Sequence, residues 1–371
     1  MYIWERADWP EFTWDAELLQ PRLNAVRLLQ GRLLGQSELL PADADPQAQM
    51  DALIQNAIRT SEIEGERLNV ESVRSSVARR LGLLRAGMAD KATPQTDALV
   101  GLLLDATEND DLPLTLERLC QWQAALFPEG PGLTGINIGA LRGESPMQVV
   151  SGPIGRRTVH FEAPPRDRLE TELQAFLDWF NHAPAGLDPL LRAGIAHLRV
   201  VTLHPFDDGN GRVTRAVTDR ALAQAERQAI RFYSLSAAIM ARRAEYYEQL
   251  EAVQKGDLEI TSWLAWFLDA LEEAMQQALA RFHCVLAKSR FWQRHAQSPL
   301  NERQLKVLNR LLDGAGEEFE HGINARKYIA LTGASKPTAT RDLIDLLEKG
   351  CLVKLPGGGR STRYAVAVDE M

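Results

Sequence analysis

The chain has 371 residues, of which 45% are hydrophobic and 25% are charged. These proportions are typical of soluble globular proteins, and the length allows two or three domains. The formal net charge of −8 argues against a protein that coats nucleic acid over its whole surface, although a local basic patch remains compatible with it. The three cysteines, Cys120, Cys284 and Cys351, are far apart; they build neither a disulfide framework nor a zinc site and suit a reducing compartment.

The first six residues contain neither the basic segment nor the apolar stretch of a secretory signal peptide. The sequence also lacks a run of ~20 apolar residues, the length that a helix needs to cross a bilayer. We therefore expect a cytoplasmic protein that does not associate with a membrane.

Apolar residues three and four positions apart predict helices over most of the chain, beginning with a helical region through Leu104. Four aromatic residues lead into it: Trp4, Trp9, Phe12 and Trp14. We expect them to dock the N-terminus onto the body, with a ligand-binding aromatic cage as the alternative. Residues 50–64 are predicted to form one helix, stopped by Gly65.

One β-hairpin is expected in the middle of the chain. Residues 148–151 and 158–161 are short runs of strand-forming residues, separated by a glycine-containing loop at residues 152–157. An isolated two-stranded hairpin is only marginally stable in water, so it must pack against the helical body. Helical periodicity resumes at about Arg166 and recurs to about Arg294.

The last part of the chain has a different pattern. Three helices are predicted at residues 302–312, 325–331 and 336–348, followed by strands at 352–355 and 362–366 around a glycine-rich tip. This order is typical of a winged helix-turn-helix. Between Lys336 and Arg363, six basic residues outnumber three acidic ones, so DNA is a candidate partner, with protein contacts as the alternative.

The chemically informative segment lies between two predicted helices. Asp188 and Pro189 favour a helix start, and the helical pattern runs from there to about Leu203. The run that follows is His204-Pro205-Phe206-Asp207-Asp208-Gly209-Asn210-Gly211-Arg212-Val213-Thr214-Arg215. Its glycines and asparagine favour a turn with positive φ over residues 208–211, and the helical pattern resumes from Arg212.

Such a turn exposes successive backbone N–H groups at the positive end of the second helix, which predicts an anion site. Arg212 and Arg215 lie three residues apart and therefore project from nearly the same face of that helix. Two guanidinium groups and a ring of amides suit a di- or triphosphate. Asp208 would repel a bare phosphate but is a suitable ligand for a Mg²⁺ that bridges to it. His204, at the edge of the turn, can accept a proton from a hydroxyl.

Each of these residues also has a structural alternative. A histidine beside a proline is usually structural, and a Gly-Asn-Gly segment is usually only a turn. Their occurrence together within twelve residues favours a site for phosphoryl-type transfer. Metal-dependent hydrolysis is disfavoured, because His197 and His204 are seven residues apart and lack the His-Glu-x-x-His pattern.

The run at residues 204–215 resembles the signature His-Pro-Phe-x-Asp-Gly-Asn-Gly-Arg-x-x-Arg of Fic-domain proteins, which mostly transfer AMP from ATP to protein hydroxyls. The resemblance implies a helical Fic core, a β-hairpin flap and an N-terminal helical region. With the C-terminal winged-helix domain that the element order predicts, the expected fold is mainly α. The resemblance also implies a role for each residue of the motif: His204 as the base for the target hydroxyl, Phe206 as a core anchor, Asp208 as the Mg²⁺ ligand, Gly209, Asn210 and Gly211 as the phosphate cradle, and Arg212 and Arg215 as the clamp on the distal phosphates.

The hairpin at residues 149–161 resembles the flap of that family, which aligns a target segment by strand addition. By this resemblance Val149, Val150, Ser151 and Gly152 belong to the ATP site. Residues 246–257 resemble the wall that contacts adenine, where Tyr246 or Tyr247 would pack near the base, although the residues alone favour a core role for both. Gln254 stands at a position where the family often has an asparagine that bonds adenine.

Residues 60–65, Thr-Ser-Glu-Ile-Glu-Gly, resemble the Ser/Thr-x-x-x-Glu-Gly/Asn inhibitory motif of the family. By this resemblance Glu64 pairs with Arg215. An arginine held by a carboxylate cannot clamp the γ-phosphate, so ATP would bind weakly or with its α-phosphate misaligned. The alternative is that Glu-Gly only ends the helix.

The resemblance covers about the first three-quarters of the chain, and four parts are expected: an N-terminal helical region with the inhibitory motif at residues 1–110, a catalytic domain at 111–260, a helical linker at 261–296 and a winged helix at 297–371. The expected function is an autoinhibited protein adenylyltransferase that uses ATP and Mg²⁺, modifies a Ser, Thr or Tyr hydroxyl of a protein, and forms a homodimer. Transfer of UMP, removal of AMP with Glu64 positioning a water, and nucleotide sensing by a DNA-binding regulator are the alternatives.

Overall fold

The computed structural model describes residues 1–37, 45–83, 91–130, 135–152, 156–182, 184, 186–226, 232–312, 322–356 and 362–367. Two predicted features lie partly outside these residues: the flap loop at 153–155, and the glycine-rich wing tip with Arg360 at 357–361. The chain divides into two compact units, Met1–Ala278 and Leu279–Met371. The four-part division at residues 110, 260 and 296 stays a prediction.

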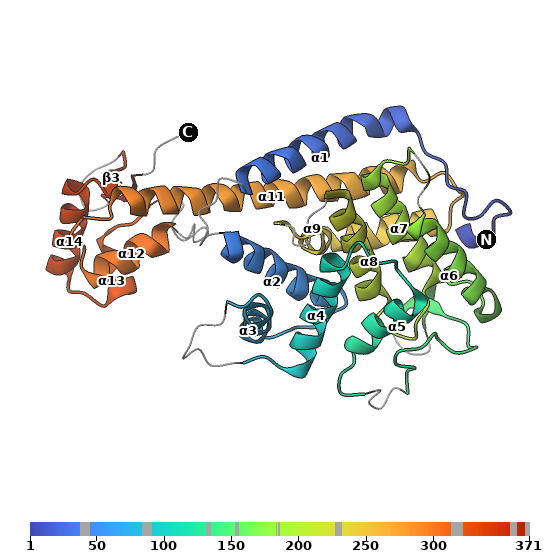
Figure 1. Ribbon diagram of the computed structural model, residues 1–371. Helices are drawn as coiled ribbons and strands as arrows, with labels where there is room; N and C mark the ends of the chain where they lie inside the picture. The colour runs from blue at the N-terminus through green and yellow to red at the C-terminus, as the bar shows by residue number, and fades with distance from the viewer. Residues whose placement is uncertain are drawn as a thin grey trace. The chain divides into compact units, whose positions relative to one another are not determined.

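The first unit is mainly helical, as predicted (Figure 1). Its helices before the flap are α1 (Ala16–Ser37), α2 (Asp45–Ile63), α3 (Val70–Arg80), α4 (Pro94–Glu108) and α5 (Leu116–Ala125). Those after the flap are α6 (Arg166–Asn181), α7 (Pro189–Leu203), α8 (Asn210–Glu226), α9 (Leu235–Ala241), α10 (Arg243–Gln254) and α11 (Thr261–Arg294), which continues past the end of the unit. No helix in the described part of the chain combines the length and the apolar character needed to span a membrane.

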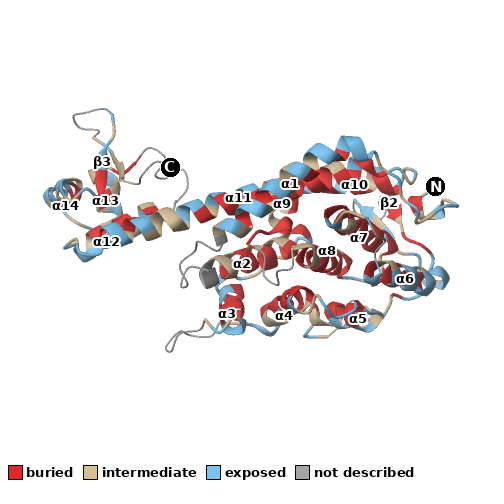
Figure 2. Ribbon diagram, turned by 45° about the horizontal axis from the view of Figure 1, so that its top comes forward, coloured by how far each residue is buried: buried red, intermediate tan, exposed pale blue. Residues whose placement is uncertain are grey.

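Helices α7 and α8 pack against each other at the centre of this unit, and both are largely buried (Figure 2). α7 begins as predicted. The Asp188 side chain accepts a hydrogen bond from a backbone N–H of the first turn, and Pro189 has no backbone N–H that would need an acceptor. Gly194 lets α11 approach closely, since a Cβ there would lie 3.0 Å from side-chain atoms of Leu264 and Phe267. The two helices that carry the motif are therefore held by the core of the unit.

His197, on α7, belongs to this core. Its Nδ1 lies 2.9 Å from the Thr218 hydroxyl and its Nε2 lies 2.9 Å from the Tyr246 hydroxyl. Thr218 donates its own proton to the Thr214 carbonyl, so it accepts from Nδ1–H, and Nε2 accepts from Tyr246. Burial lowers the pKa of His197 to about 3, which keeps the imidazole neutral. The described residues contain no cluster of three His, Cys, Asp or Glu side chains that could hold a metal.

The N-terminal aromatic residues dock onto the body, as predicted. Tyr2 packs edge-on against Phe161 of the flap, with ring centroids 5.2 Å apart, and the indole N–H of Trp4 donates to the Glu162 carbonyl. The indole N–H of Trp9 donates to a glutamate of α6. The contacts of Tyr2 and Trp4 give the base of the hairpin the support that an isolated hairpin lacks.

The predicted hairpin is present as strands β1 (Gln148–Ser151) and β2 (Thr158–Glu162). The strands pair antiparallel, with a shift in register between Val149 and Val150. Val150 and Val159 are both more than one-third exposed. Since the sheet has two strands in the described part of the chain, its outer backbone edges remain open to pairing with another segment.

The second unit contains the predicted order of elements: α12 (Glu302–Leu312), α13 (Ala325–Thr332), α14 (Lys336–Glu348), β3 (Leu352–Lys354) and β4 (Tyr364–Val366). α12 and α14 begin and end where predicted, and α13 is followed by Gly333 in a left-handed conformation. Buried side chains such as Val307, Tyr328 and Leu343 bring the three helices into one core. The designation as a winged helix-turn-helix stays a prediction.

Candidate active site

Helix α8 begins two residues earlier than predicted. The prediction assumed that residues 208–211 all leave the helix, but of these four described residues Gly209 alone has a positive φ, +87°. Asn210 already lies in the first turn and stabilises the tight entry. Its Oδ1 accepts from the Phe206 N–H at 2.9 Å, and its Nδ2 donates to the Phe206 carbonyl at 2.7 Å. Phe206 is fully buried, so the motif loop is anchored in the core.

His204 ends α7 in a left-handed conformation, with φ +49° and ψ +59°. Residues other than glycine rarely adopt this conformation. The His204 N–H donates to the Val200 carbonyl, and the His204 carbonyl accepts from Nε of Arg142 at 2.9 Å. The Arg142 N–H also donates to the Pro205 carbonyl. Arg142 is buried and thus positions the peptide of the candidate base, a role that no sequence motif indicated.

The His204 side chain is oriented to act as a base. Its Nδ1 lies 3.2 Å from the Val201 carbonyl oxygen, which can only accept, so Nδ1 carries the proton and Nε2 keeps a lone pair. Burial lowers the pKa of His204 and the charge of Arg142 lowers it further, although the Val201 bond and nearby carboxylates oppose the shift. The imidazole is therefore neutral at neutral pH and able to accept a proton through Nε2.

Asp207 and Asp208 have different surroundings. The Asp207 carboxylate accepts from the N–H groups of Asn137 and Gly143 and so ties the motif to the preceding loop. Asp208 is exposed, and one of its oxygens accepts from the Gly209 N–H at 2.6 Å. One exposed carboxylate beside a helix N-terminus fits Mg²⁺, which proteins usually hold through one or two carboxylates, with substrate phosphates and water at the other positions.

Arg215, on α8, is almost completely buried and is held by the end of α2. Its Nε donates to Thr60 Oγ1 at 2.7 Å, and its Nη2 donates to the Thr60 carbonyl at 2.8 Å. The same Nη2 donates to Glu64 Oε1 at 2.7 Å. The structure thus contains the ion pair between Glu64 and Arg215 that the sequence resemblance implies.

The Glu64 carboxylate also fills the space in front of Gly211. A Cβ on Gly211 would lie 2.0 Å from Glu64 Oε1. Burial acts to raise the pKa of Glu64, but the charges of Arg215 and Arg212 and the bond to Arg215 outweigh it and hold the pKa below its usual value. An ionised carboxylate therefore lies against the first turn of α8, where a phosphate would be expected to bind.

A second carboxylate of the same segment, Glu66, holds the other arginine of the motif. Its Oε2 lies 2.8 Å from Nη1 of Arg212, and its Oε1 accepts from the side-chain amide of Gln95 on α4. Arg212 also lies over the Phe127 ring, with its Cζ 5.6 Å from the ring centroid. The inhibitory sequence motif ends before Glu66. The position of Glu66 two residues after Glu64 was the one sign in the sequence that Glu66 belongs to the site.

A cavity of about 470 Å³ adjoins the motif. Its lining includes the carboxylates Glu64, Glu66, Glu129 and Asp208 together with Arg212 and Phe127. The cavity thus lies between the ends of α2 and α5. It is also lined by Asp208, the candidate Mg²⁺ ligand, and by Arg212, a candidate phosphate-binding arginine.

The residues implied for the adenine wall lie on α10. Tyr246 is buried and its hydroxyl donates to His197 Nε2, and Gln254 is buried with its Nε2 3.2 Å from Thr202 Oγ1. Tyr247 is 38% exposed, and its hydroxyl lies 3.4 Å from the carbonyl of the last residue of α2. Of the two tyrosines, Tyr247 is the one that is exposed. The roles of Tyr246, Tyr247 and Gln254 toward adenine stay predictions.

The flap is tied to the same helix. Ser151 Oγ lies 2.6 Å from His160 Nε2, and His160 Nδ1 lies 2.8 Å from Glu251 Oε2 on α10. Gly152 has a φ of +93°, and a Cβ there would lie 2.7 Å from the backbone across the turn, so glycine is required at this position. The contribution of Val149, Val150, Ser151 and Gly152 to an ATP site stays a prediction.

Two family models match the sequence. Residues 113–222 match the Fic/DOC family, and residues 2–83 match a domain of unknown function, DUF4172. A protein adenylyltransferase Fic of Nematostella vectensis is 35% identical over 102 residues, which are 27% of this chain and 22% of that protein. A uridine 5'-monophosphate transferase of Xanthomonas campestris pv. campestris is 34% identical over 116 residues, which are 30% of this chain and 21% of that protein. The chain thus matches less than a quarter of the length of these curated relatives.

Solved structures agree on the fold. A Fic family protein from Desulfovibrio desulfuricans G20 aligns with 98% of this chain and 99% of its own, with a TM-score of 0.55 and 18% identity. Fic-1 from C. elegans aligns with 71% of this chain and 73% of its own, with a TM-score of 0.52 and 20% identity. At these identities the likeness establishes the fold, which is the predicted helical Fic core. The chain therefore contains a Fic/DOC domain, which occupies residues 113–222.

Proposed function

We propose that this protein is an autoinhibited adenylyltransferase that moves AMP from ATP to a Ser, Thr or Tyr hydroxyl of a protein. The observation that carries the proposal is the position of the Glu64 carboxylate, which pairs with Arg215 and lies against Gly211, where phosphates of ATP would bind. A neutral His204 with a lone pair on Nε2, beside an anion-binding helix end, supports the chemistry. Relatives named protein adenylyltransferase support AMP as the transferred group.

In the proposed reaction the target hydroxyl gives its proton to Nε2 of His204 and attacks the α-phosphorus of ATP. A bond forms between the hydroxyl oxygen and that phosphorus, the bond to the bridging oxygen breaks, and diphosphate leaves. Arg212 and Arg215 would hold the distal phosphates once they are released from Glu66 and Glu64. Asp208 would hold Mg²⁺, which offsets phosphate charge when bound. The open edge of the flap would pair with the target segment.

Incubation with labelled ATP and Mg²⁺ tests this proposal. We expect weak self-labelling by the wild type and ~10–100-fold more by Glu64→Gly, because loss of one partner of a largely buried ion pair frees the arginine. Adding His204→Ala should lower labelling by ~10²–10⁴-fold, since the base is lost. Glu62→Gln is the matched control, because Glu62 pairs with Arg59 at the same helix end. Absence of labelling by Glu64→Gly with every nucleotide would contradict the proposal.

Two other activities would use the same site. The match to a uridine 5'-monophosphate transferase favours UMP as an alternative group, and replacing ATP with other nucleoside triphosphates in the labelling experiment separates the donors. Removal of AMP, with Glu64 positioning a water, predicts release of AMP from a pre-modified target by the wild type and loss of this release in Glu64→Gly. The homodimer and the cytoplasmic location stay predictions.

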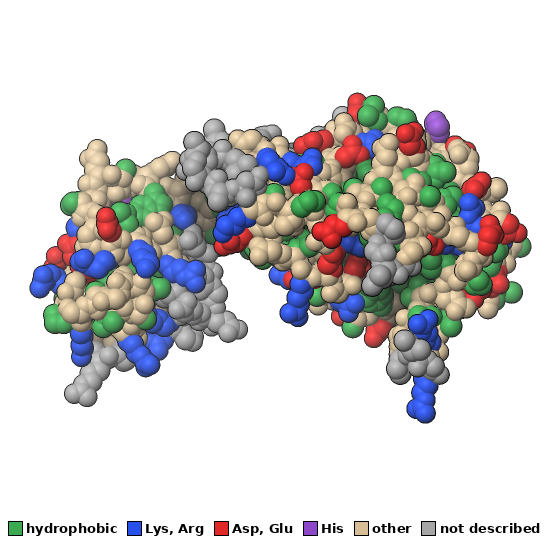
Figure 3. All heavy atoms as spheres, turned by 90° about the horizontal axis from the view of Figure 1, so that it is seen from below, with side chains coloured by type: hydrophobic (Ala, Val, Ile, Leu, Met, Phe, Trp, Pro, Cys, Tyr) green, Lys and Arg blue, Asp and Glu red, His purple; other side chains and the backbone are tan. Residues whose placement is uncertain are grey.

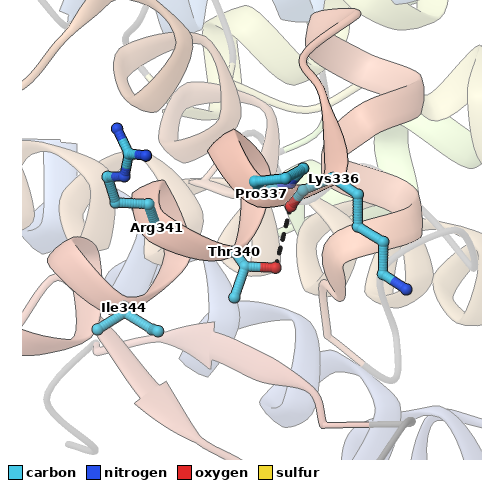
Figure 4. Close-up of a pocket in the computed structure, with 5 residues that line it drawn as sticks. All are labelled: Lys336, Pro337, Thr340, Arg341 and Ile344. Atoms are coloured by element: carbon cyan, nitrogen blue, oxygen red, sulfur yellow. Dashed lines mark hydrogen bonds between the residues drawn. The ribbon is translucent and has the colours of Figure 1, made fainter.

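For the Leu279–Met371 unit we propose DNA binding as a second function. This unit has 15 basic and 10 acidic residues, a net charge of +5, whereas Met1–Ala278 has 27 basic and 40 acidic residues, a net charge of −13. Lys and Arg side chains gather on the face of this unit in Figure 3. On α14, an open cavity is lined by Lys336, Pro337, Thr340, Arg341 and Ile344 (Figure 4). Cations beside methyl groups suit the phosphates and thymine edges of a duplex.

A further inference from the structure

The segment that ends α2 directs two carboxylates at α8. The helix stops in a turn in which the Gly65 N–H donates to the Glu62 carbonyl and the Glu66 N–H donates to the Ser61 carbonyl. Gly65 has a φ of +84°, the left-handed conformation that this type of helix end requires. Glu64 and Glu66 flank Gly65, and each carboxylate reaches a different arginine of α8.

The Glu66–Arg212 pair resembles the Glu64–Arg215 pair in its length and burial. The N–O distances are 2.8 and 2.7 Å, both arginine side chains are at least nine-tenths buried, and both carboxylates have 31% of their side-chain surface exposed. Glu66 has a further partner in the side-chain amide of Gln95. A pair held in one geometry and shielded from solvent keeps more of its attraction than a mobile surface pair.

The charge of the adjoining cavity also disfavours the binding of ATP. Among the described residues that line it, four are acidic, Glu64, Glu66, Glu129 and Asp208, and Arg212 is the one that is basic. A triphosphate that enters this space meets like charges, and the guanidinium within its reach is already paired with Glu66. Replacement of Glu64 alone frees Arg215 but leaves Arg212 paired.

We propose that Glu66 is a second inhibitory residue, which withholds Arg212 from the β- and γ-phosphates of ATP while Gln95 holds the carboxylate in place. The inference rests on the proposed function, because it names a second control of the same ATP site. Both carboxylates belong to one turn around Gly65. A movement that draws the end of α2 away from α8 therefore releases both arginines together.

Equilibrium binding of ATP in the presence of Mg²⁺, measured by titration calorimetry on the full-length protein, tests the inference without turnover. Glu66→Gln keeps the size of the side chain and removes its charge. We expect it to tighten ATP binding ~3–10-fold in the wild-type background and by at least as much in Glu64→Gly. Glu62→Gln removes the same charge from the same helix end, away from the cavity, and is expected to change the affinity by less than ~2-fold.

Gln95→Leu is the second variant. It is needed if thermal unfolding shows that Glu66→Gln is not folded. It removes the partner of Glu66 without a change of charge, and we expect ATP binding ~2–3-fold tighter than in the wild type. If both variants match Glu62→Gln while Glu64→Gly binds ATP more tightly, the inference is overturned and the proposed function stands. If no variant, including Glu64→Gly/Glu66→Gln, binds any nucleoside triphosphate, both are overturned.

Discussion

At the residue scale, His204 combines a left-handed backbone, one tautomer and a lowered pKa. The backbone conformation turns the chain out of α7 and into the motif loop, at a cost of about 1–2 kcal/mol for a residue with a Cβ. The bond from Arg142 to the His204 carbonyl helps to offset this cost. Strain of this kind persists where the surroundings enforce it, which is typical of functional sites.

The lowered pKa of His204 predicts how labelling depends on pH. The base acts in its neutral form, so the initial rate of Glu64→Gly should rise as the pH increases through the folded-state pKa and then become constant. Because burial lowers that pKa below the usual 6.5, the midpoint of the acid limb should lie below pH 6.5. Initial rates at ATP concentrations well below saturation, between about pH 5 and pH 8, measure it for the ATP-free protein. An acid limb centred above pH 6.5 would assign the dependence to another group.

At the scale of elements, the turn after α2 depends on Gly65, and this turn positions the carboxylates of both ion pairs. A Cβ on Gly65 would meet no atom within 4 Å, so Gly65→Ala acts through its positive φ alone. We expect the free energy of unfolding to fall by about 1–2 kcal/mol. We also expect ATP to bind ~3–10-fold more tightly, because the altered turn no longer holds the carboxylates of Glu64 and Glu66 against the two arginines of α8.

Denaturant unfolding and ATP titration measure these two effects. Gly35→Ala is the matched control: Gly35 lies inside α1, where a Cβ also meets no atom within 4 Å. We expect this change to raise stability by about 0.5–1 kcal/mol, as alanine does in a helix interior, and to leave ATP binding unchanged. A destabilised Gly65→Ala with wild-type affinity for ATP would show that the turn does not control the site.

Elements with strong periodicity were predictable from the sequence, whereas the start of α8 was not. α12 and α14 have the predicted bounds, and both flap strands lie within one residue of the prediction. Glycine and asparagine favour turns, so the helical pattern was expected to resume at Arg212. The two bonds between Asn210 and Phe206 let the helix begin earlier. Both bonds join the Asn210 side chain to the backbone of Phe206, and helix propensity does not account for such bonds.

At the scale of the whole molecule, the net charge of −8 conceals a division between −13 in one unit and +5 in the other. We expect the full-length protein to bind duplex DNA, with an affinity that falls as the salt concentration rises. Lys336→Glu/Arg341→Glu should weaken binding ~10-fold or more and reduce the slope of log K against log salt by ~2, if both side chains contact phosphates.

Fluorescence anisotropy between ~50 and ~200 mM salt measures this binding. Lys306→Glu/Arg310→Glu makes the same change of charge on exposed positions of α12 and should have a smaller effect. Equal losses in the two double variants would assign binding to the overall charge of the unit and not to α14. Absence of binding at the lowest salt concentration would rule out the second function.

The sequence by itself determined the mainly helical class, the hairpin and the run from His204 to Arg215, because these depend on local periodicity and on the order of residues in a short segment. The pairing of Glu64 with Arg215 was implied only by the resemblance of residues 60–65 to a family motif. Only the tertiary structure decided that Arg142, Glu66 and Gln95 belong to the site. Arg142 lies 62 residues from His204, and Glu66 lies 146 residues from Arg212. Glu66 follows α2 and Gln95 lies on α4, two helices that pack against α8, whereas Arg142 lies in the segment between α5 and β1. Contacts between such distant segments leave no periodic signal in any one of them.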